Sequence, residues 1–281
     1  MSGRAYIAAR IYQQLRAVFG VPPVALYYPQ HLLFNHAFVA GVPADVPHDL
    51  GAVPWLARYT RLPSDDWPYL YLERPSLPAH YALALAGVLA LALLSVGLAA
   101  GRGLGQGFDA PMFFLGVGFL LVETKSVTEM ALLFGSTWTV NVLVFAAVLA
   151  VVLAGSRLVA RGLAPRPEPV FALLFVTLGV GALVPVRSLA GLPLGLEWLL
   201  GGLLTAAPIA LAALIFPRLL ATRADPARAL GWNVLGGVVG GVAEYGSMLW
   251  GIKALYGLAA LAYAAAFLAR RRALASRAGG A

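Results

Sequence analysis

Residues 110–134 read APMFFLGVGFLLVETKSVTEMALLF, an apolar run that is long enough to cross a bilayer as one helix. The second half of this run carries three ionisable side chains, Glu123, Lys125 and Glu129. Charged groups inside a membrane helix cost free energy on insertion, so they are candidate functional residues. Lys125 and Glu129 are four residues apart and can pair on one helical face, whereas Glu123 points elsewhere.

Two interpretations of these side chains remain open. The functional one is a polar cluster that faces the interior of a helix bundle and binds a cation or relays a proton. The structural one has two forms. Either the polar middle of the helix packs against other helices, or the helix ends near Val122 and the charged residues lie at the membrane interface.

The whole chain has the composition of a membrane protein. It has 281 residues, of which 60% are hydrophobic and only 11% are charged, and its mean hydropathy is +0.82. A soluble domain has about 25% charged residues, so the composition excludes a soluble globular enzyme, a nucleic-acid-binding protein and a disordered tail. The absence of cysteine excludes disulfides, thiol nucleophiles and iron–sulfur ligation.

Seven apolar runs of membrane length are separated by short segments rich in glycine and proline. They cover residues 81–100, 110–134, 138–156, 169–186, 197–217, 229–249 and 253–269. We therefore predict an all-α membrane fold, a polytopic bundle of about seven transmembrane helices. The helical domain is expected to cover residues 79–281 and to follow a short α/β segment over residues 1–78.

Arginine clusters predict the orientation of the bundle, because short cytoplasmic loops carry an excess of basic residues. The clusters are Arg157, Arg161 and Arg166; Arg218, Arg223 and Arg228; and Arg270, Arg271, Arg272 and Arg277. They fall on one side if every intervening run crosses the membrane. We expect a multi-pass protein of the inner membrane with a cytoplasmic C-terminus. Strict alternation then places residues 1–80 outside, with Arg102 as the sole basic residue of the first inner loop.

The sixth run combines polar and small residues. Asn233 and Glu244 lie within it, and small residues recur at the spacing that lets membrane helices approach closely. The pairs are Gly236 with Gly240 and Gly237 with Gly241. This face is expected to pack against another helix with a polar partner, and the alternative is a narrow passage.

No catalytic or metal-binding motif is evident in the sequence. The four histidines, His31, His36, His48 and His80, lack metal-type spacing with carboxylates. The glycine-rich segment 101–107 matches neither the dinucleotide-binding nor the P-loop pattern. We expect no metal, no catalytic residue and no nucleic-acid partner in this chain, and the expected partner is the lipid bilayer.

The first 80 residues predict a small α/β segment. Residues 7–19 have helical spacing, with apolar side chains on one face and Arg10 and Gln14 on the opposite face. Residues 24–28 and 37–40 are typical of short strands. One helix and two strands cannot bury a core of their own, so this segment is expected to be the end of a larger α/β domain.

This segment continues into Ser64-Asp65-Asp66-Trp67-Pro68-Tyr69-Leu70-Tyr71-Leu72. With the helix and strands before it, it resembles the closing section of the spermidine-synthase-like domain of bacterial membrane-fused proteins. Residues 118–123, GFLLVE, and 231–237, GWNVLGG, resemble the membrane segments of that family, as does Glu244-Tyr245. The resemblance covers nearly the whole chain. Its most specific blocks are Asp65-Asp66-Trp67-Pro68 and Glu123-Thr124-Lys125-Ser126.

The resemblance implies that residues 1–78 are the C-terminal remnant of a Rossmann-like, methyltransferase-type aminopropyltransferase domain. Family members that use an S-adenosyl-type cofactor need an upstream glycine-rich turn and a catalytic acid, and this chain contains neither. We therefore expect it to be catalytically incomplete and to hold no cofactor by itself. It is either a C-terminal fragment with an upstream or partner catalytic domain, or a degenerate relative.

The resemblance also implies that a cytoplasmic domain precedes the first span, which conflicts with strict alternation. Either residues 110–134 are re-entrant and six spans remain, or the amino-terminal segment lies outside and binds no cofactor.

Three functions are consistent with these patterns. The first is a membrane anchor that also handles a polyamine or another small cation, for which Glu123, Glu129 and Glu244 are the candidate carboxylates. The second is half of an ion- or proton-coupled secondary transporter. The third is a structural membrane assembly protein in which the glycine faces pack.

Overall fold

A computed structural model describes residues 5–27, 36–41, 61–100, 107–135 and 137–278 of the chain. The chain divides into two compact units, Met1–Ser76 and Leu77–Ala281. The first unit contains the only strands of the described residues, and the second is built from helices.

The first unit contains one helix and a two-stranded antiparallel sheet. Helix α1 covers Ala5–Phe19, and strands β1 and β2 cover Val24–Tyr27 and His36–Val39. The helix and the two strands predicted from the sequence are therefore present. The last residue of the first predicted strand, Tyr28, lies outside the described residues.

The predicted faces of α1 are wrong. Arg10, which the helical spacing placed on the polar face, is fully buried, whereas Val18 is 76% exposed. The reason is that the guanidinium of Arg10 donates hydrogen bonds to backbone carbonyls of residues 69–73, a contact across more than fifty residues that helical periodicity does not report.

Each of the seven predicted apolar runs corresponds to a long helix of the second unit, with boundaries that differ at two of them. The helices are α2 Ala79–Ala100, α3 Ala110–Phe134, α4 Trp138–Ala160, α5 Pro167–Leu183, α6 Leu194–Leu220, α7 Pro226–Glu244 and α9 Ala254–Ala278. A 3₁₀ helix, η3 Val186–Leu189, and a single turn, α8 Ser247–Trp250, lie between them. The predicted all-α helix bundle is confirmed.

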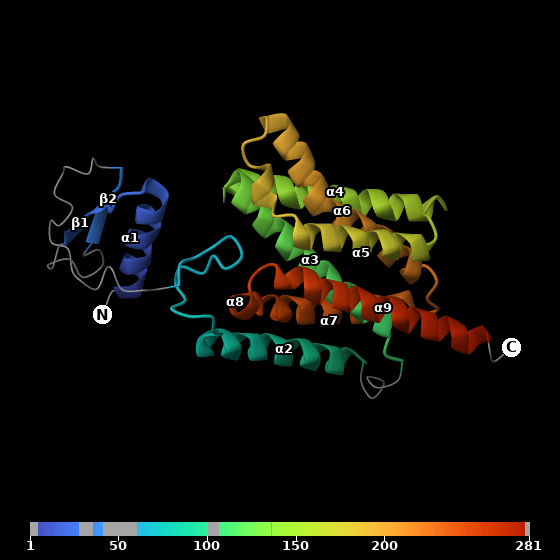
Figure 1. Ribbon diagram of the computed structural model, residues 1–281. Coiled ribbons are helices and arrows are strands. Elements are labelled where there is room, and N and C mark those ends of the chain that lie inside the picture. The colour runs from blue at the N-terminus through green and yellow to red at the C-terminus, as the bar shows by residue number, and fades with distance from the viewer. Residues whose placement is uncertain (1–4, 28–35, 42–60, 101–106, 136, 279–281) are drawn as a thin grey trace. The chain divides into compact units, whose positions relative to one another are not determined.

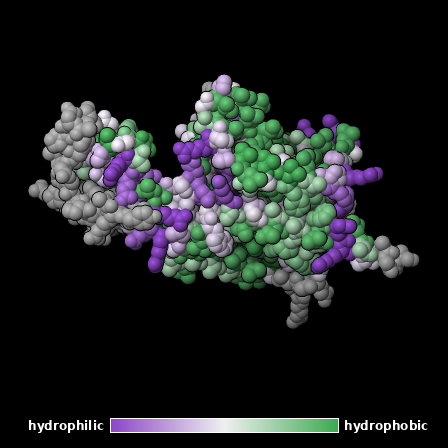
Figure 2. Space-filling view, in the orientation of Figure 1, coloured by the Kyte–Doolittle hydropathy of each residue, from purple (hydrophilic) through white to green (hydrophobic). Residues whose placement is uncertain are grey.

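Four of these helices are long and apolar enough to cross a membrane. They are Ala79–Leu98, Ala110–Phe134, Asn141–Ala160 and Gly195–Leu220, while Pro167–Leu183 is a shorter apolar helix. In the view of Figure 2, hydrophobic residues cover the middle of the helical unit. Exposed side chains such as Leu83, Leu149 and Leu203 contribute to this apolar exterior. The chain is a membrane protein, and the number of seven spans stays a prediction.

Two predicted boundaries differ from the structure. The run 229–249 is not one helix, because α7 ends at Glu244 and α8 follows after a turn in which the Gly246 N–H donates to the carbonyl of Ala243. The run 169–186 ends at Leu183, since Pro185 lacks the N–H that a further helical turn requires.

Helix α3 is uninterrupted, so the alternative in which it ends near Val122 is wrong. Asp109 caps its N-terminus by accepting a hydrogen bond from the Met112 N–H at 3.2 Å, and Pro111 occupies its first turn. The helix ends before Gly135, whose φ of +88° is one that other residues rarely adopt.

Helix α3 is the centre of the bundle. It packs most extensively against α7 and α9 on one side and against α6 and α4 on the other, as Figure 1 shows. The core accordingly combines Met112 and Leu115 of α3 with Phe171 of α5, Ile209 of α6 and Tyr263 of α9. Helix α2 lies at the edge, where it packs against α7. No residue in its most apolar stretch is buried.

The close approach of α3 and α7 depends on glycine. A Cβ added at Gly236 would overlap the carbonyl oxygen of Phe113, and one added at Gly240 would lie 2.7 Å from that of Val117. Gly237, by contrast, has open space at its Cβ position. Of the two small-xxx-small pairs in the sequence, only Gly236 with Gly240 has the backbone of α3 where a Cβ would lie.

Substituting Gly236→Ala is expected to force α7 away from α3 and to lower the free energy of unfolding by about 1–3 kcal/mol. Gly237→Ala, one residue away in the same helix, is the matched control and should leave it unchanged or raise it by up to about 1 kcal/mol, because alanine is the better helix former. Unfolding of both variants in detergent micelles, followed by circular dichroism, checks this. Equal effects of the two substitutions would contradict the packing described above.

Candidate functional site

The ionisable residues of α3 form a cluster inside the bundle. The Lys125 ammonium donates a hydrogen bond of 2.6 Å to Oε1 of Glu129, and each side chain is only 5% exposed. This is the pair that the four-residue spacing predicted. Its formation removes the net charge that would otherwise make burial of either group costly.

Tyr256 of α9 completes the cluster. Its hydroxyl donates a hydrogen bond of 2.7 Å to the other carboxylate oxygen of Glu129, Oε2, and its ring centroid lies 4.9 Å from the Lys125 nitrogen. The carboxylate is thus held by one donor on its own helix and one on α9. No pattern in the sequence indicated Tyr256, because the contact joins residues 127 positions apart.

The cluster lies near one end of α3 rather than at its middle. Glu129 is 19 residues beyond Ala110, which at the helical rise corresponds to roughly 28 Å along the axis. The hydrocarbon core of a bilayer is about 30 Å thick. Tyr256 is likewise in the first turn of α9. If α3 begins at one membrane surface, the cluster lies close to the opposite surface.

Other polar side chains link α3 to α6 and α7. The Thr124 hydroxyl donates to Oε2 of Glu244 at 2.8 Å, and the Asn233 side-chain amide donates to the Met112 carbonyl at 2.9 Å. The Ser126 hydroxyl, which is buried, donates to a backbone carbonyl of α6 at 2.9 Å. Helix α3 therefore has a polar bond to each of the helices α6, α7 and α9.

The three candidate carboxylates have different surroundings. Glu129 is paired with Lys125 and Tyr256, and Glu244 accepts from Thr124. Glu123 is half-buried, and the described part of the chain offers it neither an ion pair nor a hydrogen bond. Glu129 and Glu244 share no hydrogen-bond partner, and the three carboxylates form no group that could hold a metal ion in the described part of the chain.

The sequence block Asp65-Asp66-Trp67-Pro68 belongs to the first unit. Trp67 is 1% exposed, and its N–H lies in a turn closed by Ser64, whereas Asp65 and Pro68 are exposed and Asp66 is partly buried. The Arg10 guanidinium lies 5.5 Å from the Trp67 ring.

Arg10 organises the chain that follows Trp67. Its guanidinium donates to the carbonyl of Leu70 at 2.8 Å and to that of Glu73 at 2.7 Å. Burial lowers the pKa of Arg10 below its ordinary value, and the nearby Tyr6 and Glu73 counteract this shift. An arginine nevertheless stays protonated, so α1 and residues 69–73 are held together by charge-assisted hydrogen bonds.

Within the described ranges, no group of three or more histidine, aspartate or glutamate side chains could hold a metal ion. The predictions for His31, His48 and the glycine-rich residues 101–106 concern parts of the chain outside the described residues. Comparison of the chain with protein-family models, with curated proteins and with solved structures finds no match.

The hydrogen bond from Tyr256 gives a direct test of the cluster. Tyr256→Phe leaves one carboxylate oxygen of Glu129 without its donor and should lower the free energy of unfolding by about 1–2 kcal/mol. Tyr263→Phe is the control, because the Tyr263 hydroxyl is buried on the same helix without a hydrogen-bond partner in the described structure. We expect it to be neutral or stabilising. Unfolding in detergent micelles measures both, and a loss in Tyr263→Phe as large as in Tyr256→Phe would contradict the assignment.

Proposed function

We propose that this chain is the integral membrane portion of a spermidine-synthase-like protein, where it serves as a catalytically incomplete membrane anchor. The main support comes from α3, whose Lys125–Glu129 pair is neutralised internally and completed by Tyr256. A carboxylate already held by an ammonium and a phenol is poorly suited to take up another cation. These polar groups suit the structural role of holding α3 against its neighbours.

The distribution of arginines supports an inner-membrane location with a cytoplasmic C-terminus. Arg223, after α6, pairs with Asp109 at the start of α3, and Arg270 of α9 pairs with Glu168 at the start of α5. Arg218 of α6 also donates to the carbonyl of Ala164, just before α5, so the starts of α3 and α5 and the C-terminal parts of α6 and α9 lie at one end of the bundle. Basic residues at one end are typical of the cytoplasmic side.

The continuity of α3 favours alternation over a re-entrant segment. If each of the seven long helices of the described chain crosses the bilayer, residues 1–78 lie on the side opposite the C-terminus. The amino-terminal unit then remains outside and binds no cytoplasmic cofactor.

The cysteine-free sequence makes this topology easy to test. In intact cells, a membrane-impermeant maleimide should label Ser76→Cys, whereas Ser276→Cys should be labelled only after the membrane is opened. Both variants should stay in the membrane pellet after alkaline carbonate extraction, which separates integral from peripheral proteins. Labelling of both cysteines from the same side would overturn alternation and restore the scheme of six spans with one re-entrant segment.

A second candidate function, handling of a polyamine or another small cation, is favoured by Glu123. This half-buried carboxylate lies on α3 and has no ion pair or hydrogen bond among the residues described. Intramembrane carboxylates of this kind mark cation and proton pathways in transporters.

Spermidine uptake separates the two functions. The anchor proposal predicts that proteoliposomes with the purified chain take up no more labelled spermidine than empty liposomes, and that Glu123→Gln changes neither this result nor assembly. The matched control is Glu197→Gln, at the start of α6. Uptake by the unmodified chain that Glu123→Gln abolishes and Glu197→Gln preserves would replace the anchor by a transporter.

A further inference from the structure

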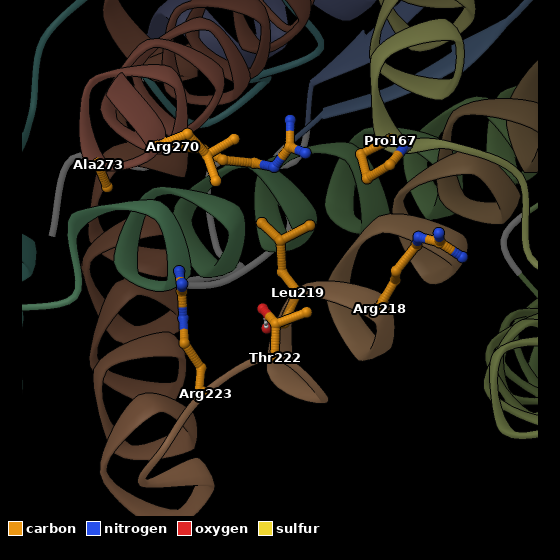
Figure 3. A pocket seen from close by; sticks show the side chains of 8 residues that line it. Pro167, Arg218, Leu219, Thr222, Arg223, Arg270 and Ala273 are labelled. Carbon is orange, nitrogen blue, oxygen red and sulfur yellow. Dashed lines mark hydrogen bonds between the residues drawn. The ribbon is translucent and has the colours of Figure 1, made fainter. Parts of the chain in front are cut away.

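A cavity of about 360 Å³ lies where α5 begins and α6 and α9 end. Three arginines line it, one near the end of α6, one just after α6 and one from α9, and Figure 3 shows them placed around Leu219 and Thr222. They are Arg218, Arg223 and Arg270. None of the polar cluster on α3 contributes to this cavity, so it is separate from the site described above.

The three arginines differ in how their charges are balanced. Arg223 forms an ion pair with Asp109, with 2.7 Å between Nε and Oδ2, and Arg270 forms one of 2.7 Å with Glu168. Arg218 donates to the backbone carbonyl of Ala164 at 2.8 Å. Within the described ranges no carboxylate pairs with Arg218, so the cavity keeps an uncompensated positive charge.

Arg218 also keeps donors for a ligand. A guanidinium carries five N–H groups, and the contact with Ala164 uses one of its terminal nitrogens. Two N–H groups of a planar guanidinium can donate parallel hydrogen bonds to two oxygens of one phosphate. The exposed Thr222 also lines the cavity. Its hydroxyl donates to the Leu219 carbonyl at 2.7 Å, which leaves its oxygen able to accept a further hydrogen bond.

The rest of the cavity is apolar. Leu219 is only 3% exposed and Pro167 is buried, whereas Leu274 is 49% exposed. A ligand that fills this space therefore needs an anionic group beside an apolar part. A free inorganic anion would satisfy the arginine and leave the apolar lining unused.

The position of the cavity matches such a ligand. It lies at the end of α6, one of the helices that are long and apolar enough to cross a bilayer, and the ends of such helices lie at the level of lipid headgroups. Basic pockets between transmembrane helices on the cytoplasmic side are known to hold anionic headgroups.

We propose that this cavity binds the phosphate of an anionic phospholipid, with Arg218 as the main contact and the apolar lining against the glycerol and upper acyl chain. The inference requires the chain to be in a membrane but does not depend on its anchoring a spermidine-synthase-like protein. A bound lipid would connect the start of α5 with the ends of α6 and α9.

The test uses the full chain, purified in detergent, with phosphatidylglycerol and phosphatidylcholine as probes in native mass spectrometry. We expect phosphatidylglycerol to bind at least about tenfold more tightly than phosphatidylcholine. Arg218→Gln, which keeps a donor for Ala164 but removes the charge, should abolish this preference. The matched control is Arg161→Gln, an exposed arginine directly after α4 that does not line the cavity, and it should change binding by less than about twofold.

Three results would overturn the proposal. The first is equal binding of the two lipids, and the second is an equal loss in Arg161→Gln, which would show diffuse attraction by the basic end. The third is binding of inorganic phosphate at millimolar concentration, lost in Arg218→Gln, without any preference for phosphatidylglycerol. Thermal unfolding of Arg218→Gln in phosphatidylcholine nanodiscs, where its midpoint should equal that of the unmodified chain, separates lost binding from lost folding.

Discussion

A buried ammonium–carboxylate pair that must be kept away from lipid determines how the helices of this bundle pack. Lys125 and Glu129 neutralise each other, but the second carboxylate oxygen still needs a donor, and Tyr256 supplies it from α9. Because an unsatisfied polar group in hydrocarbon costs several kcal/mol, packing against α3 is favoured for the helices that complete its hydrogen bonds. This requirement explains why α3 is central. Helix α2, which has no such bond to α3 among the described residues, lies at the edge.

Polar bonds and glycine contacts act together along α3. Hydrogen bonds from Thr124 and Asn233 join α3 and α7 at two levels, and between them Gly236 and Gly240 let the two backbones come close. In lipid, where burial of apolar surface gives little driving force between helices, close van der Waals packing and a few directional bonds are the main sources of stability. The α3–α7 contact contains both.

The features that could be predicted from the sequence are those that depend on residues close together in the chain. Apolar runs predicted the helices, and the four-residue spacing predicted the Lys125–Glu129 pair. Three features could not be predicted, because they depend on contacts between residues far apart in the chain. They are the hydrogen bond from Tyr256 to Glu129, the burial of Arg10, and the fact that Gly236 rather than Gly237 faces the backbone of α3. Both glycine pairs have the same spacing, and only the direction in which each faces α3 distinguishes them. The boundary error after Glu244 has a similar origin, since a one-turn helix and its preceding turn have the same apolar composition as a continuous span.

The chain order of these contacts has a consequence for how the protein is made. Tyr256 follows Glu129 by 127 residues, so α3 enters the bilayer long before α9 can complete its hydrogen bonds. Until then, the neighbouring turn of α3 itself provides the counter-charge for Lys125. Helix α2 also lacks its packing partner at first, because α7 is synthesised only after the whole segment between Ala100 and Pro226. An apolar helix such as α2 can remain alone in lipid during that interval, and a local ion pair lets α3 do the same.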